Sequence, residues 1–92
     1  MKVERLETKF GNLSTNQIAI IDKDKVTFQS YTTKIAVLKD STVTLGLYWD
    51  CSHTTIWYLY QFLRDYAHLD IHSKKDVFRY ADEGKIKFTK RF

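Results

Sequence analysis

The spacing of the apolar residues changes at Asp50, and this change limits the fold more than any other feature of the chain. Before Asp50, apolar and polar residues alternate, which is the pattern of half-buried strands. After Asp50, apolar residues recur three and four positions apart, which is the pattern of an amphipathic helix. A block of strands followed by a block of helices is typical of the α+β class. We therefore expect one α+β domain over residues 1–92.

Four or five antiparallel strands are expected in the first half of the chain. After an alternating segment from Leu6 to Phe10, two hairpins follow, which join residues 17–22 to 25–31 and residues 35–39 to 42–49 through short polar turns. Alternation in the last of these segments predicts which side chains enter the core. They are Val43, Leu45, Leu47 and Trp49.

Two helices are expected to cover this sheet. The first begins at Ser52 or Thr54, whose hydroxyl groups can cap its free amides, and runs to about His68. Its buried stripe is predicted to be Ile56, Leu59, Tyr60, Leu63 and Ala67. The second helix opens at Ser73, with Asp76 three residues on, and ends at Gly84. A short amphipathic strand over residues 85–92 completes the domain.

The composition excludes several classes of function. The single cysteine rules out an intrachain disulfide, and no apolar run is long enough to span a membrane. The first residues contain Glu4 and Arg5 and no apolar stretch, so we expect no secretory signal and a cytoplasmic location. Isolated glycines exclude a phosphate-binding loop. Cys51 and His53 are two positions apart at a strand-to-helix junction and rarely face each other in such a place, so we expect no enzyme.

The positive charge lies near the C-terminus. The formal net charge is +4, with eight basic and eight acidic residues up to position 70, and seven basic and three acidic residues after it. This excess predicts a surface for nucleic acid or for an acidic protein. The candidate residues are Lys74, Lys75, Arg79, Lys85, Lys87 and Arg91. The alternative is that lysines on a terminal strand only protect a sheet edge from aggregation.

The outer face of the first helix is a second candidate surface. Trp57, Gln61 and Arg64 recur at positions i, i+4 and i+7, with Tyr58 beside them. Tryptophan, tyrosine and arginine dominate binding hot spots, because rigid rings and planar guanidinium groups gain much contact at a small cost in entropy. We predict a docking face here. The alternative is that the second helix packs over Trp57 and Tyr58 and makes them part of the core.

A metal site is the third candidate. In His68-Leu69-Asp70-Ile71-His72, extended backbone would project His68, Asp70 and His72 together, as two imidazoles and one carboxylate suited to zinc. If the first helix instead continues through His72, Asp65, His68 and His72 share one face at positions i, i+3 and i+7 and form another set of ligands. The alternative to a metal site is that histidines at a helix C-terminus interact only with the helix dipole and with solvent.

Four segments carry a resemblance to a known group of proteins. They are Phe28-Gln29-Ser30-Tyr31, Ile35-Ala36, Tyr48-Trp49-Asp50-Cys51-Ser52-His53-Thr54-Thr55 and Tyr58-Leu59-Tyr60-Gln61-Phe62-Leu63. Together they resemble small proteins encoded by phages and prophages of Gram-positive bacteria, a group that includes anti-CRISPR inhibitors of Cas9. The resemblance implies a non-enzymatic inhibitor that docks on a host CRISPR effector such as Cas9 and blocks nucleic-acid loading. The alternative is a small basic nucleic-acid-binding accessory protein, with or without a structural zinc site.

Overall fold

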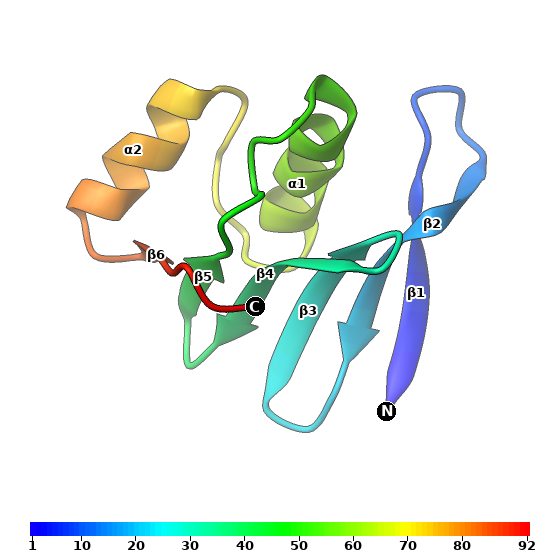
Figure 1. Ribbon diagram of the computed structural model, residues 1–92, viewed down its shortest axis with the longest axis horizontal. Coiled ribbons are helices and arrows are strands. Elements are labelled where there is room, and N and C mark those ends of the chain that lie inside the picture. The colour runs from blue at the N-terminus through cyan, green and yellow to red at the C-terminus, as the bar shows by residue number, and fades with distance from the viewer.

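A computed structural model describes residues 1–92 as one mixed six-stranded sheet with two helices (Figure 1). The elements in chain order are β1 (Lys2–Glu7), β2 (Leu13–Ile21), β3 (Lys25–Ser30), β4 (Thr33–Lys39), β5 (Thr42–Leu45), α1 (His53–Asp65), α2 (Lys74–Asp82) and β6 (Ile86–Phe88). The strands lie side by side in sequence order, and each of the first four pairs antiparallel with the next. The predicted α+β class is confirmed. Five strands precede the helices and one follows them, and the last strand pair is parallel, so the sheet is not purely antiparallel as predicted.

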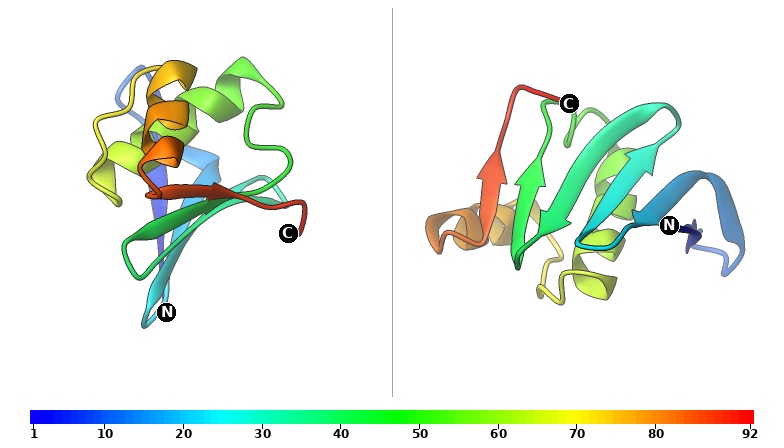
Figure 2. Two further views of the ribbon diagram at one scale, coloured as in Figure 1. Left: turned by 90° about the vertical axis from the view of Figure 1, so that its left-hand side faces the viewer. Right: turned by 90° about the horizontal axis from the view of Figure 1, so that it is seen from below.

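The last strand pair decides where the helices lie. β6 pairs parallel with β5, so the chain must cross over the sheet between them. Both helices belong to this crossover, and both cover the same face (Figure 2). Seen from below, the opposite face carries no helix. No helix is long and apolar enough to cross a membrane.

The core lies between the helices and the covered face of the sheet. At its centre the rings of Phe28 and Phe62 stack at 5.6 Å, and neither is exposed to solvent. The buried side chains of α1 are Thr55, Tyr58, Leu59, Phe62 and Leu63. The predicted stripe is therefore right at Leu59 and Leu63, whereas Ile56, Tyr60 and Ala67 are only half-buried. α1 packs on β1 and β3, while α2 packs on β6.

The segment after β5 differs from the predicted strand. β5 ends at Leu45, and the chain then turns toward α1. Trp49 is buried as predicted, with its ring 6.1 Å from Phe78 and 5.9 Å from Phe88. Leu47 is exposed, because the alternation of a strand no longer applies beyond Leu45.

The predicted helix boundaries have the expected local chemistry. Ser52 caps α1 by accepting a hydrogen bond from the backbone N–H of Thr55 at 3.1 Å. Ser73 caps α2 in the same way, accepting from the N–H of Asp76 at 3.3 Å. Gly84 follows α2 with a φ of 80°, a conformation that favours glycine. Both helix starts are confirmed.

Loss of the α2 cap should be measurable. We expect Ser73→Ala to lower the free energy of unfolding by about 1 kcal/mol, because the N–H of Asp76 then has no side-chain partner. Ser73→Asp keeps an oxygen at the cap and should stay within about 0.5 kcal/mol of the wild type. Urea denaturation followed by circular dichroism measures both. Equal stability of the wild type and Ser73→Ala would contradict a role for this cap.

A hydrogen bond ties the end of α1 to β1. The hydroxyl group of Tyr66 donates to the Glu4 carboxylate at 2.6 Å. Burial and this bond raise the pKa of Tyr66 above its ordinary value, and the bond together with Lys2 lowers the pKa of Glu4. Because the pKa of Tyr66 is raised, Tyr66 contributes to folding stability at pH values below its ordinary pKa of 10.0. This contribution is lost as the pH rises further. Because the pKa of Glu4 is lowered, Glu4 contributes to folding stability at pH values above its ordinary pKa of 4.5. This contribution is lost as the pH falls.

The effect of Tyr66→Phe should therefore depend on pH. We expect this variant to be less stable than the wild type near neutral pH, where the donor is protonated and the acceptor is ionised. The difference in stability should shrink when pH falls below the ordinary pKa of Glu4, and again when it rises above that of Tyr66. Thermal melts across the pH range measure the difference, and a difference that does not vary with pH would rule out this bond as its source.

Candidate binding site at the amino end of α1

Three surface cavities meet at the amino end of α1. The middle one, here called the tip cavity, has a volume of about 470 Å³. It is lined by Gln17, Ser30, Tyr31, Thr33, Ile35, Tyr48, Cys51, Ser52, Thr54 and Thr55. On one side it shares Thr54 with a cavity of about 430 Å³ that reaches Phe10 and Trp57. On the other side it shares Cys51 and Ser52 with a cavity that extends to α2.

The tip cavity is built from segments that are far apart in the sequence. The β3–β4 turn forms one side, and there Tyr31 has a φ of 55° and its N–H donates to the carbonyl of Asn16 at 2.7 Å. The segment between β5 and α1 forms the other side. The lining residue Gln17 lies opposite Ser30 in the β2–β3 ladder. The sheet register therefore fixes the position of Gln17 relative to the turn.

One residue that lines the tip cavity has a buried and unsatisfied polar atom. The Gln17 side chain is only 4% exposed, and its Oε1 has no hydrogen-bond partner in the protein. Ser30 and Thr55 beside it are also buried. A buried acceptor without a donor costs about 1–3 kcal/mol, so such groups are rare in folded proteins. The oxygen itself has almost no exposed surface, so a donor from a partner reaches it only if the side chains around the cavity move.

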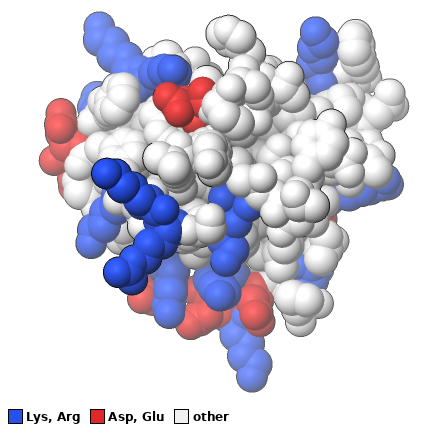
Figure 3. Space-filling view, in the orientation of Figure 1, with Lys and Arg blue, Asp and Glu red and all other residues white.

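The rim of the tip cavity is aromatic and uncharged. Tyr31 is 64% exposed and Tyr48 is 56% exposed. None of the ten lining residues carries a formal charge. Figure 3 shows a broad uncharged area between the amino end of α1 and the β3–β4 turn. These properties suit a neutral polar group with apolar surroundings, such as a protein side chain, rather than an ion.

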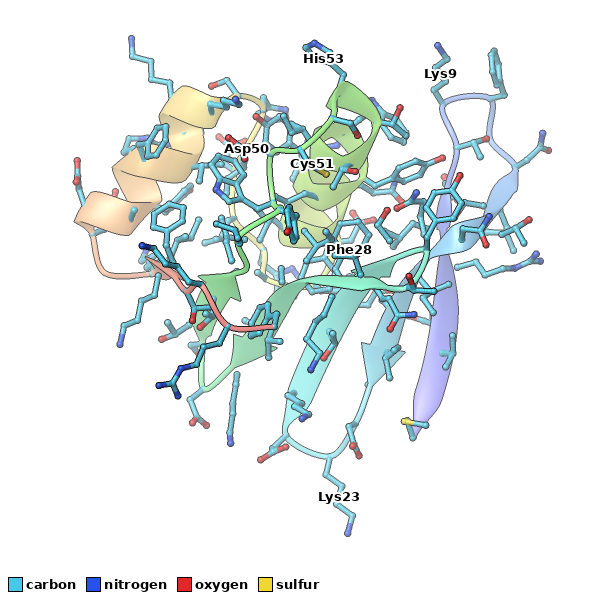
Figure 4. All side chains as sticks on the ribbon, viewed as in Figure 1. Lys9, Lys23, Phe28, Asp50, Cys51 and His53 are labelled. Carbon is cyan, nitrogen blue, oxygen red and sulfur yellow. The ribbon has the colours of Figure 1, made fainter.

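Cys51 and His53 lie near the tip cavity without contacting each other through their side chains. The thiol of Cys51 lies 3.7 Å from Oγ1 of Thr55. His53 is the first residue of α1, and Figure 4 shows its side chain pointing away from Cys51 at the end of the helix. The two side chains thus form no nucleophile and base pair.

The predicted docking face on α1 is formed only in part. Trp57 is 40% exposed, and its ring packs edge-on against Tyr58 at 5.0 Å. Tyr58 itself is buried. Gln61 donates to the carbonyl of Glu7 and accepts from its N–H, both at 2.8 Å. Arg64 donates to the carbonyl of Ile71 at 2.8 Å, so Trp57 alone of the four predicted residues keeps a large free surface.

The reason for this difference is the orientation of α1. The helix turns the side carrying Tyr58 and Gln61 toward β1 and the loop that follows it, and the second helix does not cover Trp57. Neither of the two alternatives drawn from the sequence describes the whole arrangement, because Tyr58 is buried but lies beside the β1–β2 loop instead of α2.

The predicted basic residues lie on α2, after it, on β6 and in the C-terminal tail, and α2 packs on β6. Three of them form ion pairs, namely Lys74 with Asp50 at 3.5 Å, Arg79 with Asp76 at 3.5 Å and Lys85 with Glu83 at 3.6 Å. Such exposed pairs are weak and leave the side chains free to exchange partners. The residues without an ion pair are Lys75 on α2, Lys87 on β6 and Arg91 in the C-terminal tail.

The predicted metal ligands do not converge. Nε2 of His72 lies 2.8 Å from the Asp70 carboxylate. His68 has a φ of 56°, so the backbone is not extended there and its side chain does not follow the expected alternation. The structure holds no group of three or more His, Cys, Asp or Glu side chains placed to bind one metal ion. The arrangement expected for zinc is therefore not formed.

The fold and the cavity define a small α+β domain with one helical layer and a candidate binding site at one end. The chain belongs to DUF8033, a family of unknown function, whose family model matches residues 1–79. The matched range contains every residue that lines the tip cavity. Neither the curated proteins nor the solved structures give a match to this chain.

The tip cavity is the part of the site that the sequence interpretation missed. One signal was present, because eight of its ten lining residues lie in the segments that carry the resemblance to phage-encoded proteins. A second signal was Gln17, a polar residue on the same strand face as the buried Ala19. A polar residue at a core-facing position indicates either a buried hydrogen bond or a functional site.

Proposed function

We propose that this protein is a non-enzymatic binding protein that takes up a side chain or short segment of a partner protein in the tip cavity. The observation that carries the proposal is the buried, unpartnered Oε1 of Gln17. The entering segment displaces the side chains around Gln17 and supplies the missing donor. Tyr31 and Tyr48 at the rim then close over it and exclude water, as residues around a hot spot do.

The neighbouring cavity extends the proposed contact. It lies between the β1–β2 loop and α1, and its exposed rings are those of Phe10 and Trp57. These rings, with Tyr31 and Tyr48, place four exposed aromatic side chains around one end of the molecule. Aromatic side chains provide large contact areas and have few rotatable bonds, so this end suits a protein partner better than an ionic ligand.

The proposed partner is a CRISPR effector such as Cas9, which the resemblance of the sequence implies. Binding of the effector at the tip cavity would block nucleic-acid loading without any chemical step. This proposal predicts a stoichiometric complex, and its affinity should depend on the aromatic rim.

Tyr48→Ala should weaken this complex at least tenfold, because a hot-spot aromatic side chain contributes about 2 kcal/mol or more to binding. Isothermal titration calorimetry of Cas9 without guide RNA measures the affinity. The matched control is Phe78→Ala, which removes a ring of similar exposure that is on α2 and does not line the tip cavity. Because this ring packs on Trp49, thermal melts must show that the variant is folded. The control should change the affinity less than threefold.

Two results would contradict the proposal. No heat of binding with wild-type protein would exclude Cas9 as the partner. Equal losses for Tyr48→Ala and Phe78→Ala would exclude the tip cavity as the contact.

A further inference from the structure

The sheet face opposite the helices carries a second surface, which the proposed function does not use. We propose that this open face binds the phosphate backbone of double-stranded DNA without reading its sequence. The proposal rests on the strand register and on the charges that the register places together, and it is independent of the tip cavity.

The register defines rows of side chains across the open face. The longest row crosses all six strands and consists of Val3, Ile20, Thr27, Val37, Thr44 and Lys87. A second row consists of Arg5, Ile18, Gln29 and Lys34. A third row near the hairpin turns consists of Lys25, Lys39 and Thr42. No helix covers these rows (Figure 2).

The charges in these rows have one sign. The rows contain five cationic side chains and no carboxylate. Only Lys39 is neutralised, by Asp24 at 3.6 Å. Three acidic residues of the hairpin turns, Asp22, Asp24 and Asp40, bound the third row. A polyanion is therefore expected to avoid that end and to lie across Arg5, Lys34 and Lys87.

These three cations span the sheet. Arg5 is on β1, Lys34 is on β4 and Lys87 is on β6. With adjacent strands about 4.8 Å apart, the first and the last are separated by about 24 Å. Isoleucine, valine and threonine side chains lie between them, and Thr27 at the centre of the longest row is buried. The stripe is long enough to contact several successive phosphates.

The chemistry of the face favours a duplex. The rows contain no aromatic side chain, and Nζ of Lys34 lies 5.5 Å from the centre of the Phe92 ring. Unpaired bases therefore lack the row of stacking partners that single-strand binding proteins provide. Duplex DNA carries one charge per about 1.7 Å of its axis, more than a single strand or an acidic polypeptide, so it gains most from a purely cationic face.

Fluorescence anisotropy with a labelled duplex of about 20 base pairs and random sequence tests the proposal, using the full chain over a range of salt concentrations. The wild type should bind at low salt, with a slope of log K against log salt of about −3 for three phosphate contacts. The double variant Arg5→Glu with Lys87→Glu should lose at least tenfold in affinity.

The control carries the same net charge. It combines Lys9→Glu in the β1–β2 loop with Lys75→Glu on α2, two cations that form no ion pair and lie away from the open face. The control should lose less than threefold in affinity. Thermal melts must show that both double variants are folded.

Four results would overturn the proposal. They are no binding at low salt, equal losses for the two double variants, tighter binding of a single strand of the same length, and displacement of the duplex by polyglutamate at equal charge concentration. The last result would identify an acidic protein as the occupant of the face.

Discussion

Replacing Phe62 by alanine is expected to lower the free energy of unfolding by about 3–5 kcal/mol. The ring has no exposed surface and stacks on Phe28 at 5.6 Å with an angle of 26° between the planes. This contact joins the middle of α1 to β3. A domain of this size has a total stability of about 5–14 kcal/mol, so the variant should lose a large part of it.

Urea denaturation followed by circular dichroism measures this loss. The matched control is Phe10→Ala, because the ring of Phe10 is 80% exposed and its removal should change stability by about 0.5 kcal/mol or less. A loss below about 1 kcal/mol for Phe62→Ala would show that α1 is held to the sheet by other contacts.

Gln17→Met should stabilise the free protein and impair its function. Methionine has nearly the same length, and it removes the buried oxygen that lacks a donor, so we expect a gain of about 1 kcal/mol. The same change removes the acceptor that we propose for the partner. Binding of Cas9 should therefore weaken at least tenfold, as measured by the same calorimetric titration.

Gln61→Met is the matched control for this change. Both polar atoms of the Gln61 side chain are bonded to the backbone of Glu7, so its replacement should lower stability by about 1–2 kcal/mol. The two glutamines should thus change stability in opposite directions. A loss of stability in Gln17→Met would show that its oxygen is satisfied in solution, and it would remove the main support for the site.

Features governed by local chemistry could be predicted from the sequence. Ser52, Ser73 and Gly84 mark helix ends by interactions within a few residues, and the structure has all three in these roles. The hairpin turns are local in the same sense. The buried positions Val43 and Leu45 follow from alternation within a single strand.

Features that depend on distant parts of the chain could not be predicted in this way. The rotation of α1 depends on which strands it packs against, and this rotation moved Tyr58 into the core and bound Gln61 to β1. The parallel pairing of β6 depends on the length of the crossover. The two tyrosines at the cavity rim, Tyr31 and Tyr48, come together only after the sheet register is set.

The positions of the charged residues also depend on distant parts of the chain. Lys74 and Lys87 belong to the same basic C-terminal segment of the sequence. The fold places Lys74 on α2 beside Asp50 and Lys87 on the sheet face opposite the helices. Arg5 on that face lies within residues 1–70, where the charges balance, so net charge alone gave no sign of it.

The side-chain amide signal of Gln17 in a nuclear magnetic resonance titration with Cas9 tests the central claim most directly. Gln17→Met identifies the signal by its disappearance, and Gln61 provides a reference amide whose bonds are already formed. We predict that the Gln17 signal shifts when the partner binds, while the Gln61 signal keeps its position. A complex that forms while the Gln17 signal stays at its free position would contradict the account.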